Sequence, residues 1–272
     1  MNAQQKFDAA IKKNNSLVCV GLDAQLDKLP RHIHALRNPL FEFNKAIIDT
    51  THDLVATFKP NIAFYEAYGI EGLKQLKLTI EYLRRTYANI PVLLDAKRAD
   101  IGNTSKMYAK SAFEYWEADA VTVYPYPGLD AIQPFFDYSD RMTILLIKTS
   151  NPGAAKISDL QVGEKPFYLK LAEEVKSWDK KNAGIFVGAT YPSQLKEIRA
   201  IFPESFFLSA GLGAQEGEIK EAVQAGVDKD GGGIAFNASR SIIYASEDKD
   251  FAEKAREATE KLRDEINQHR NQ

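Results

Sequence analysis

Three charged residues follow an apolar segment near the middle of the chain. The segment runs from Ile90 to Leu94, and Asp95, Lys97 and Asp100 come directly after it. Side chains alternate along a β-strand, so Asp95 and Lys97 should project from the same face. Charges at the rim of an apolar core are costly unless they are paired or used. This Asp-x-Lys-x-x-Asp motif is therefore either a structural salt bridge or part of an active site.

Lys97 lies between two acidic residues, and this limits the chemistry that it can perform. Neighbouring carboxylates favour the charged ammonium form of a lysine. A charged lysine is a poor Schiff-base nucleophile, because that role requires a desolvated amine. If the motif is an active site, the spacing predicts that Lys97 is a proton donor or an electrostatic clamp.

The elements that must position this motif form a repeating pattern of strands and helices. The predicted strands are 16–23, 57–64, 90–97, 120–126, 142–150, 182–190, 205–211 and 232–237. The predicted helices that follow them are 43–55, 67–87, 103–116, 128–136, 166–180, 192–202, 215–225 and 251–267, and a short amphipathic helix, 1–15, precedes the first strand. Eight such units in 272 residues predict an α/β fold, a single-domain (β/α)8 TIM barrel. A doubly wound open sheet is the alternative, but no G-x-G-x-x-G follows the first strand.

The predicted strand ends bring the charged residues together. Active sites of such barrels lie at the C-terminal ends of the strands. The first strand ends in Asp23, the second carries Lys59, and the third delivers Asp95 and Lys97. A solvated rim could supply one or two of these charges by chance. Four charges of alternating sign on three consecutive strands favour an active site.

Later strand ends carry residues that are suited to binding an anion. Ser150 ends the fifth strand as a neutral hydrogen-bonding group, although it could equally cap a turn. A glycine-rich segment, Gly211 to Gln215, follows the seventh strand, and Ser239 and Arg240 follow the eighth. Loops seven and eight of these barrels often bind phosphate through backbone N–H groups, and an arginine can add two parallel hydrogen bonds. We therefore expect a phosphate site at these two loops.

Composition argues against several other classes of protein. The formal net charge is −2, so no basic surplus points to nucleic acid or to an acidic membrane surface. No apolar segment approaches the thickness of a bilayer, and the polar stretch from Met1 to Asn15 does not fit a signal peptide. The single cysteine, Cys19, excludes a disulfide within the chain. These features predict a soluble, cytoplasmic protein. The four histidines, His32, His34, His52 and His269, show no metal-ligand spacing, and His32 and His34 lie in a predicted loop, so we expect no metal or other cofactor.

The string Leu-Asp-Ala-Lys-Arg-Ala-Asp-Ile-Gly-Asn-Thr, which ends at Thr104, resembles the signature of the orotidine 5′-monophosphate decarboxylase family. The resemblance is to the longer, mainly bacterial branch, and it extends over nearly the whole chain. The other similar segments are Val20 to Asp23, Phe58 to Glu66, Lys148 to Gly153, Gly211 to Gln215 and Asn237 to Arg240.

The resemblance implies a cofactor-free decarboxylation of orotidine 5′-monophosphate to UMP and CO2, the last step of UMP synthesis. It also implies roles for matching residues. Lys97 matches the residue that protonates C6 of the pyrimidine, and Asp95 matches the acid beside the substrate carboxylate. Lys59 and Asp100 complete an alternating Lys-Asp-Lys-Asp array of catalytic residues. A lone ammonium beside C6 could stabilise the carbanion left in the ring plane.

Further matching residues imply contacts with the rest of the substrate. Asp23 matches a ligand of the ribose hydroxyls, and Ser150 matches a contact with the pyrimidine. Gln215 and Arg240 match contacts with the phosphate. Ala210 departs from the family, which commonly has proline before Gly-x-Gly, and this leaves the stiffness of the phosphate loop open.

The resemblance also implies a homodimer with shared active sites. Asp100, Ile101 and Thr104 match positions that reach the site of the partner subunit. A small nucleotide and a second copy of the chain are therefore the expected partners.

Three alternative functions remain open from the sequence. A related phosphosugar decarboxylase or epimerase on the same barrel would use a similar motif together with a metal. A Schiff-base aldolase would form a covalent adduct on Lys97 or Lys59. A nucleotide-binding protein without catalytic activity would keep the fold and lose turnover.

Overall fold

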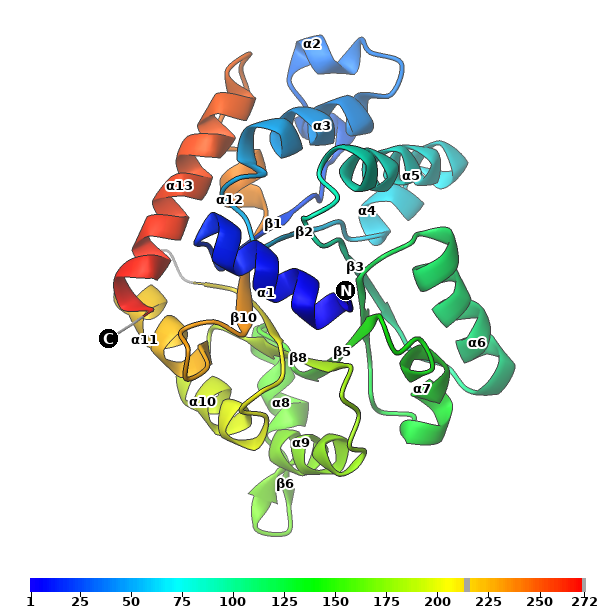
Figure 1. Cartoon of the computed structure of the whole chain (residues 1–272), viewed down its shortest axis with the longest axis vertical. Coiled ribbons are helices and arrows are strands. Elements are labelled where there is room, and N and C mark those ends of the chain that lie inside the picture. The colour runs from blue at the N-terminus through cyan, green and yellow to red at the C-terminus, as the bar shows by residue number, and fades with distance from the viewer. Residues whose placement is uncertain (213–215, 271–272) are drawn as a thin grey trace.

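Eight parallel strands form a cylinder with helices around its outside, as Figure 1 shows. The computed structural model describes residues 1–212 and 216–270. The barrel strands are β1 (Val18–Gly21), β2 (Thr57–Lys59), β3 (Leu93–Arg98), β4 (Ala120–Val123), β5 (Met142–Lys148), β8 (Ala183–Gly188), β9 (Phe207–Ala210) and β10 (Ile234–Ala238). They pair in the order β2-β1-β10-β9-β8-β5-β4-β3, so the predicted (β/α)8 barrel is confirmed.

The helices cover the outside of the barrel and fill its connections. The longer ones are α1 (Ala3–Asn14), α3 (Pro39–Thr51), α5 (Gly69–Thr86), α6 (Gly102–Lys110), α7 (Leu129–Phe136), α9 (Phe167–Ser177), α10 (Pro192–Ile201), α11 (Glu216–Gly226) and α13 (Phe251–His269). The short ones are η1 (Leu26–Lys28), α2 (Arg31–His34), α4 (Ala63–Glu66), the π-helical turn η2 (Ser111–Tyr115), η3 (Pro152–Ala154), α8 (Ala155–Ser158) and α12 (Arg240–Ile243). None of the described helices is long and apolar enough to cross a membrane.

The barrel closes at a joint between β2 and β3 that has little regular pairing. In the described residues, the backbone pairing between these two strands consists of the isolated parallel bridges of Phe58 with Val92 and of Asn61 with Asp95. Pro60 follows β2 directly, and a proline has no N–H to donate to a ladder. The backbone of Asp95 is nevertheless held on both sides, because its N–H donates to the Pro60 carbonyl at 3.0 Å and its carbonyl accepts from Ile62 N–H at 3.3 Å.

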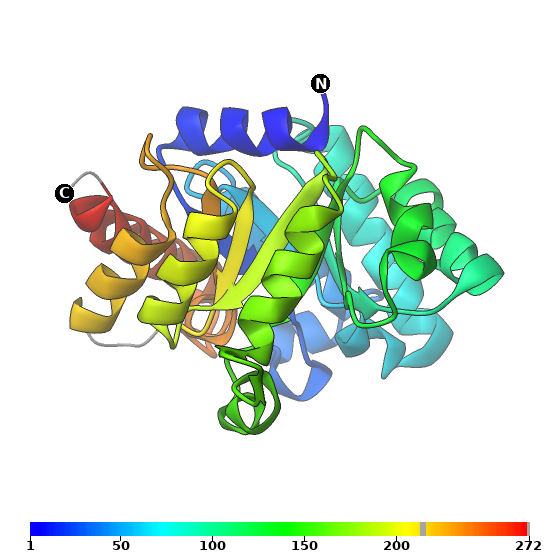
Figure 2. The ribbon, with the colours of Figure 1, turned by 90° about the horizontal axis from the view of Figure 1, so that it is seen from below.

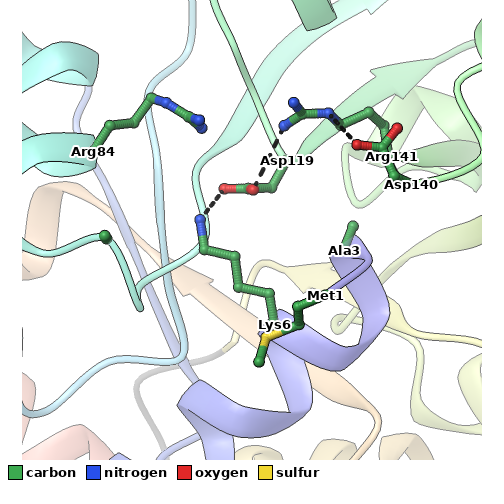
Figure 3. A pocket seen from close by; sticks show the side chains of 8 residues that line it. Met1, Ala3, Lys6, Arg84, Asp119, Asp140 and Arg141 are labelled. Atoms are coloured by element: carbon green, nitrogen blue, oxygen red, sulfur yellow. Dashed lines mark hydrogen bonds and ion pairs between the residues drawn. The ribbon is translucent and has the colours of Figure 1, made fainter.

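Helix α1 lies across the N-terminal end of the barrel, which Figure 2 shows from the side. Its Phe7 ring is buried and lies 4.3 Å from the ring of Phe206, centroid to centroid. Lys6 Nζ lies 2.7 Å from Asp119 Oδ2, and the same oxygen accepts from Val92 N–H at 2.8 Å. A polar cavity of about 240 Å³ lies beside this pair (Figure 3). Lys6, Asp119, Asp140 and Arg141 of its lining pair with one another, whereas Arg84 pairs with Glu117 outside the lining. We interpret the cavity as part of the anchor of α1.

Several predicted boundaries differ from the structure. The second strand ends at Lys59 and not at residue 64, because Pro60 interrupts the ladder. The helix expected at 43–55 begins at Pro39, a residue that favours the first helical turn. His32 and His34 belong to the short helix α2 and not to a loop. The short helices α4 and α12 were not predicted.

The connection from β5 to α9 is longer than the other loops and has structure of its own. It contains η3, α8 and an antiparallel hairpin of β6 (Gln161–Val162) and β7 (Lys165–Pro166). The sequence predicted only a long connection at 151–165. This connection, residues 149–166, is called the strand-five loop below. It lies at the opposite end of the barrel from α1 (Figure 2).

Candidate active site

The carboxylate of Asp95 is the centre of a polar cluster at the C-terminal ends of β2, β3 and β4. Its Oδ2 atom accepts from Lys59 Nζ at 3.1 Å and from Asn61 Nδ2 at 3.2 Å. Its Oδ1 atom accepts from Lys97 Nζ at 2.6 Å and from Thr122 Oγ1 at 2.9 Å. Four donors from three strand ends therefore fix the orientation of this carboxylate.

The backbone of β3 is irregular where it carries these residues. Its pairing with β4 shifts register between Leu94 and Arg98, and Lys97 has a positive φ of 47°. A non-glycine residue rarely adopts this conformation, and bulges next to active sites re-aim side chains. The Lys97 N–H donates to Thr122 Oγ1 at 2.9 Å, which holds the bulge. The same-face prediction assumed a regular strand. In the structure Asp95 and Lys97 contact each other across a bulge, where simple alternation does not apply.

The charges of this cluster stabilise one another against burial. Burial alone would raise the pKa of Asp95, but the positive charges of Lys59 and Lys97 outweigh it and hold that pKa well below its usual value. Burial alone would lower the pKa of Lys59, but the charges of Asp95 and Asp23 raise it above its usual value. Asp95 and Lys59 are therefore charged together at neutral pH.

Asp23 and Ser239 meet at the neighbouring rim, between the ends of β1 and β10. Asp23 is buried, and its Oδ1 accepts from the backbone N–H of Asn61 at 3.3 Å. A Cβ atom added at Gly21 would lie 1.8 Å from Ser239 Oγ and 3.2 Å from Asp23 Oδ2. Only glycine fits there, so Gly21 makes room for both polar side chains beside Lys59.

Ser150 and Arg240 lie at other strand ends of the same rim. A Cβ added at Gly188 would lie 2.8 Å from the Cβ of Ser150, and one added at Gly211 would lie 3.1 Å from it. Ser150 therefore lies against the ends of β8 and β9. Arg240 begins α12 just after β10 and is exposed, and its guanidinium has no hydrogen bond or ion pair within residues 1–212 and 216–270.

Comparison with known proteins identifies the family of this barrel. Residues 16–255 match the family described as Orotidine 5′-phosphate decarboxylase / HUMPS. The chain belongs to this decarboxylase family. Orotidine 5′-phosphate decarboxylase from Christiangramia forsetii is 46% identical over 263 residues, which cover 96% of each chain.

Solved structures of the same family have the same fold. Leishmania donovani OMP decarboxylase matches with a TM-score of 0.84 and 36% identity, over 99% of both chains. Leishmania donovani UMP synthase matches with a TM-score of 0.85 and 37% identity, over 98% of this chain but 56% of that one. The predicted family, barrel fold and decarboxylase activity are confirmed by these matches.

The structure does not bring every predicted site residue to the cluster. The Asp100 carboxylate accepts from the N–H of Ile101 at 2.8 Å and forms no hydrogen bond or ion pair with Lys97 in the part of the chain that is described. Ile101 is 66% exposed, and Thr104 is exposed on α6. Gln215 lies outside the described residues. The roles that the family resemblance implies for these four residues stay predictions.

Sequence reasoning missed Asn61 and Thr122, which both bind Asp95. Asn61 lies two residues after Lys59, beyond the proline that ends β2, so its position at a strand end was the available signal. Thr122 lies inside β4 and is buried among apolar neighbours, where a threonine is an ordinary strand residue. Nothing in its local sequence marks it.

The described residues contain no group of three or more histidine, cysteine, aspartate and glutamate side chains that could hold a metal ion. Cys19 is buried in β1, and burial raises the pKa of its thiol to about 12. Its Sγ lies 3.5 Å from Asn237 Oδ1. The thiol is therefore a packed core group and not a nucleophile at neutral pH.

Proposed function

We propose that this chain decarboxylates orotidine 5′-monophosphate with Lys97 as the proton donor, and that it does so without a cofactor. The observation that carries the proposal is the unequal exposure of the two lysines bound to Asp95. The Lys97 side chain is 38% exposed, whereas that of Lys59 is 5% exposed. Only Lys97 can both contact Asp95 and reach a ligand at the barrel mouth.

The chemistry follows from the charge of this cluster. When the bond between C6 and the carboxylate breaks, CO2 leaves and the electron pair stays on C6, in the plane of the ring. A preorganised ammonium beside C6 stabilises this charge. Lys97 then transfers a proton to C6, which gives UMP, and its amine recovers a proton from solvent. Asp95 keeps the Lys97 side chain oriented until that transfer.

The remaining rim residues are proposed to bind the rest of the nucleotide. Asp23 would accept hydrogen bonds from the ribose hydroxyls, and Ser150 would contact the pyrimidine. Ser239, Arg240 and Gln215 would bind the phosphate. Phosphate binding far from C6 supplies energy that can position the ring for reaction.

We also propose a homodimer in which Asp100, Ile101 and Thr104 reach the partner's site. Asp100 lies beyond the end of β3 and forms no hydrogen bond or ion pair with Lys97 of its own chain in the described residues. Ile101 and Met107 are large apolar residues that are 66% and 63% exposed, and both lie at α6. An exposed apolar surface next to the active site is suited to a two-fold contact.

Two properties of the whole chain stay proposals. We propose a single domain, because the last helix, α13, packs against the end of the first helix, α1. Asn267 Nδ2 of α13 donates to the carbonyl of Asn15, which caps α1, at 2.8 Å.

We also propose a cytoplasmic location, which would give the enzyme access to its nucleotide substrate.

The deciding experiment follows the ultraviolet absorbance of orotidine 5′-monophosphate after addition of the protein and a chelator. We expect the absorbance to fall and UMP to form. Activity that disappears with chelator and returns with a divalent cation would favour a metal-dependent phosphosugar enzyme on the same barrel. Trapping of an adduct on Lys97 or Lys59 by borohydride would favour an aldolase, and nucleotide binding without turnover would favour an inactive binding protein.

A further inference from the structure

Lys148, the last residue of β5, is a buried charged group that the proposed chemistry does not use. Its side chain has no exposed surface, and its Nζ forms an ion pair with Asp159. The Nζ also lies 4.7 Å from the ring centroid of Tyr168 and 5.0 Å from that of Tyr191. One carboxylate and two aromatic faces therefore surround this ammonium.

Asp159 belongs to the strand-five loop and is fixed within it. Its backbone N–H donates to the Ala155 carbonyl at 3.1 Å, which makes it the C-cap of α8. Its Oδ1 also accepts from Ser158 Oγ at 3.1 Å. The ion pair with Lys148 consequently ties α8 to the end of a barrel strand.

This ion pair is close in sequence to Ser150, which follows Lys148 by two residues. Pairing of β5 with β8 shifts register between Leu146 and Lys148, so the strand ends in an irregular segment. The backbone of Ser150 then lies against Gly188, where an added Cβ would lie 2.8 Å from the Ser150 Cα. The path of the chain at Ser150 therefore depends on two contacts, the glycine on one side and the ion pair on the other.

We propose that Lys148 and Asp159 are positioning residues that hold the strand-five loop so that the Ser150 hydroxyl faces the pyrimidine. This inference rests on the proposed function of Ser150. The Lys148 side chain is fully buried, whereas that of Asp159 is 36% exposed. An ion pair with a buried ammonium adds little stability compared with apolar residues of similar size, but it satisfies that ammonium in only one geometry. A charged pair at this place therefore fits a role in orientation better than a role in stability.

The test compares Asp159→Asn with Glu173→Gln as a matched control. Glu173 of α9 pairs with Lys165 of the same loop, but the Lys165 side chain is 48% exposed, whereas that of Lys148 has no exposed surface. An exposed pair contributes little, so the control should behave as wild type. Asp159→Asn should lower kcat/KM for orotidine 5′-monophosphate by roughly 10- to 100-fold, as a displaced positioning group does.

A double-mutant cycle with Ser150→Ala separates positioning from a general structural effect. If the pair acts through Ser150, Asp159→Asn should cause little further loss in the Ser150→Ala background. A full loss in both backgrounds would overturn the proposal, and so would a normal kcat/KM for Asp159→Asn alone. If Asp159→Asn unfolds, the double variant Lys148→Met with Asp159→Asn removes the lysine charge that would otherwise be left unpaired. Its kcat/KM is then compared with wild type and in the Ser150→Ala background in the same way.

A second readout does not depend on the reaction. Lys156 is exposed in α8, and tryptic cleavage there reports how firmly the loop is held. Asp159→Asn should be cut faster than wild type and Glu173→Gln should not, and equal rates would overturn the proposal. If the wild-type chain does not convert orotidine 5′-monophosphate, the proposed function fails, whereas the proteolysis result still decides whether the pair holds the loop.

Discussion

At the scale of single residues, the site depends on one carboxylate that holds two ammonium groups. Asp95 binds the Nζ atoms of Lys59 and Lys97 through different oxygens. The neutral donors Asn61 and Thr122 occupy the remaining directions. Removing any one of these donors should therefore change the orientation of the Asp95 carboxylate, and with it the position of Lys97.

Lys97→Ala should abolish turnover and leave the fold intact. It removes the proton donor and the charge that opposes the carbanion, and proton transfer alone is typically worth about 10²–10⁴-fold in rate. The measurement is kcat for orotidine 5′-monophosphate together with the circular dichroism spectrum. Lys106→Ala, on the exposed side of α6, is the control. A near-normal kcat for Lys97→Ala would show that Lys97 has been given the wrong role.

Arg240→Ala should damage kcat/KM more for the nucleotide than for the nucleoside orotidine. Its guanidinium is exposed beside the proposed phosphate site, and a hydrogen bond to a charged group contributes about 1.5–3 kcal/mol. Steady-state kinetics with both substrates make the comparison. Equal losses with the two substrates would remove Arg240 from the phosphate site.

The charged cluster predicts how stability depends on pH. The pKa of Asp95 is lowered in the folded state, so its contribution is present at neutral pH and is lost as the pH falls below about 4. The pKa of Lys59 is raised, so its contribution is lost as the pH rises above about 10.4. In urea unfolding at several pH values, Asp95→Asn should flatten the acid side of the stability profile and Lys59→Met the alkaline side. Unchanged slopes would contradict the coupling.

At the scale of elements, a buried arginine connects the segments that lead into β9 and β10. Arg199 of α10 donates five hydrogen bonds to backbone carbonyls, those of Phe202, Ser205, Gly226 and Gly233. Its guanidinium also lies 3.6 Å from the ring centroid of Phe207. One side chain thus satisfies carbonyls from two connections and fixes the start of two barrel strands.

Arg199→Met should lower the free energy of unfolding by at least about 3 kcal/mol, because several buried carbonyls lose their donor and each costs about 1–3 kcal/mol. Urea denaturation followed by circular dichroism gives this difference. Arg85→Met, at an exposed position of α5, should change stability by less than about 0.5 kcal/mol. A similar small change at Arg199 would mean that water replaces its hydrogen bonds.

At the scale of the whole molecule, the question is whether one chain contains a complete site. Asp95, Lys97 and Lys59 meet within one barrel, whereas Asp100 forms no hydrogen bond or ion pair with them in the described residues. Exposed Ile101 and Thr104 follow Asp100 at the start of α6. This arrangement is expected if a second copy completes each site.

Mixing Lys97→Ala chains with Asp100→Ala chains should restore activity after subunit exchange. In a shared-site heterodimer, one site carries both substitutions and the other carries neither, so the intact site can turn over. Activity of the mixture relative to each variant alone is the measurement, and sedimentation checks the dimer. If Asp100 serves Lys97 of its own chain, every site stays defective and the mixture stays inactive.

The sequence was sufficient for the barrel and for the charged strand ends, because both follow from local patterns. Apolar runs followed by helical periods predict the eight units, and Asp23, Lys59 and Asp95 each lie where such a run ends. The bulge that gives Lys97 a positive φ was not predictable, since it depends on how β3 pairs with β4. The partnership of Thr122 with Asp95 also arises only once two strands are in register.

The sparse pairing between β2 and β3 has a consequence for how the enzyme can evolve. Contacts from Lys59 and Asn61 to Asp95 cross this joint, where Pro60 has no N–H to donate and regular backbone pairing is sparse. The side chains proposed for chemistry therefore also hold β2 and β3 together in the barrel. In many enzymes, replacing a catalytic charge relieves strain and raises stability. Here the same replacement should loosen the barrel wall, so a descendant that abandoned the reaction would still be under selection to keep these side chains.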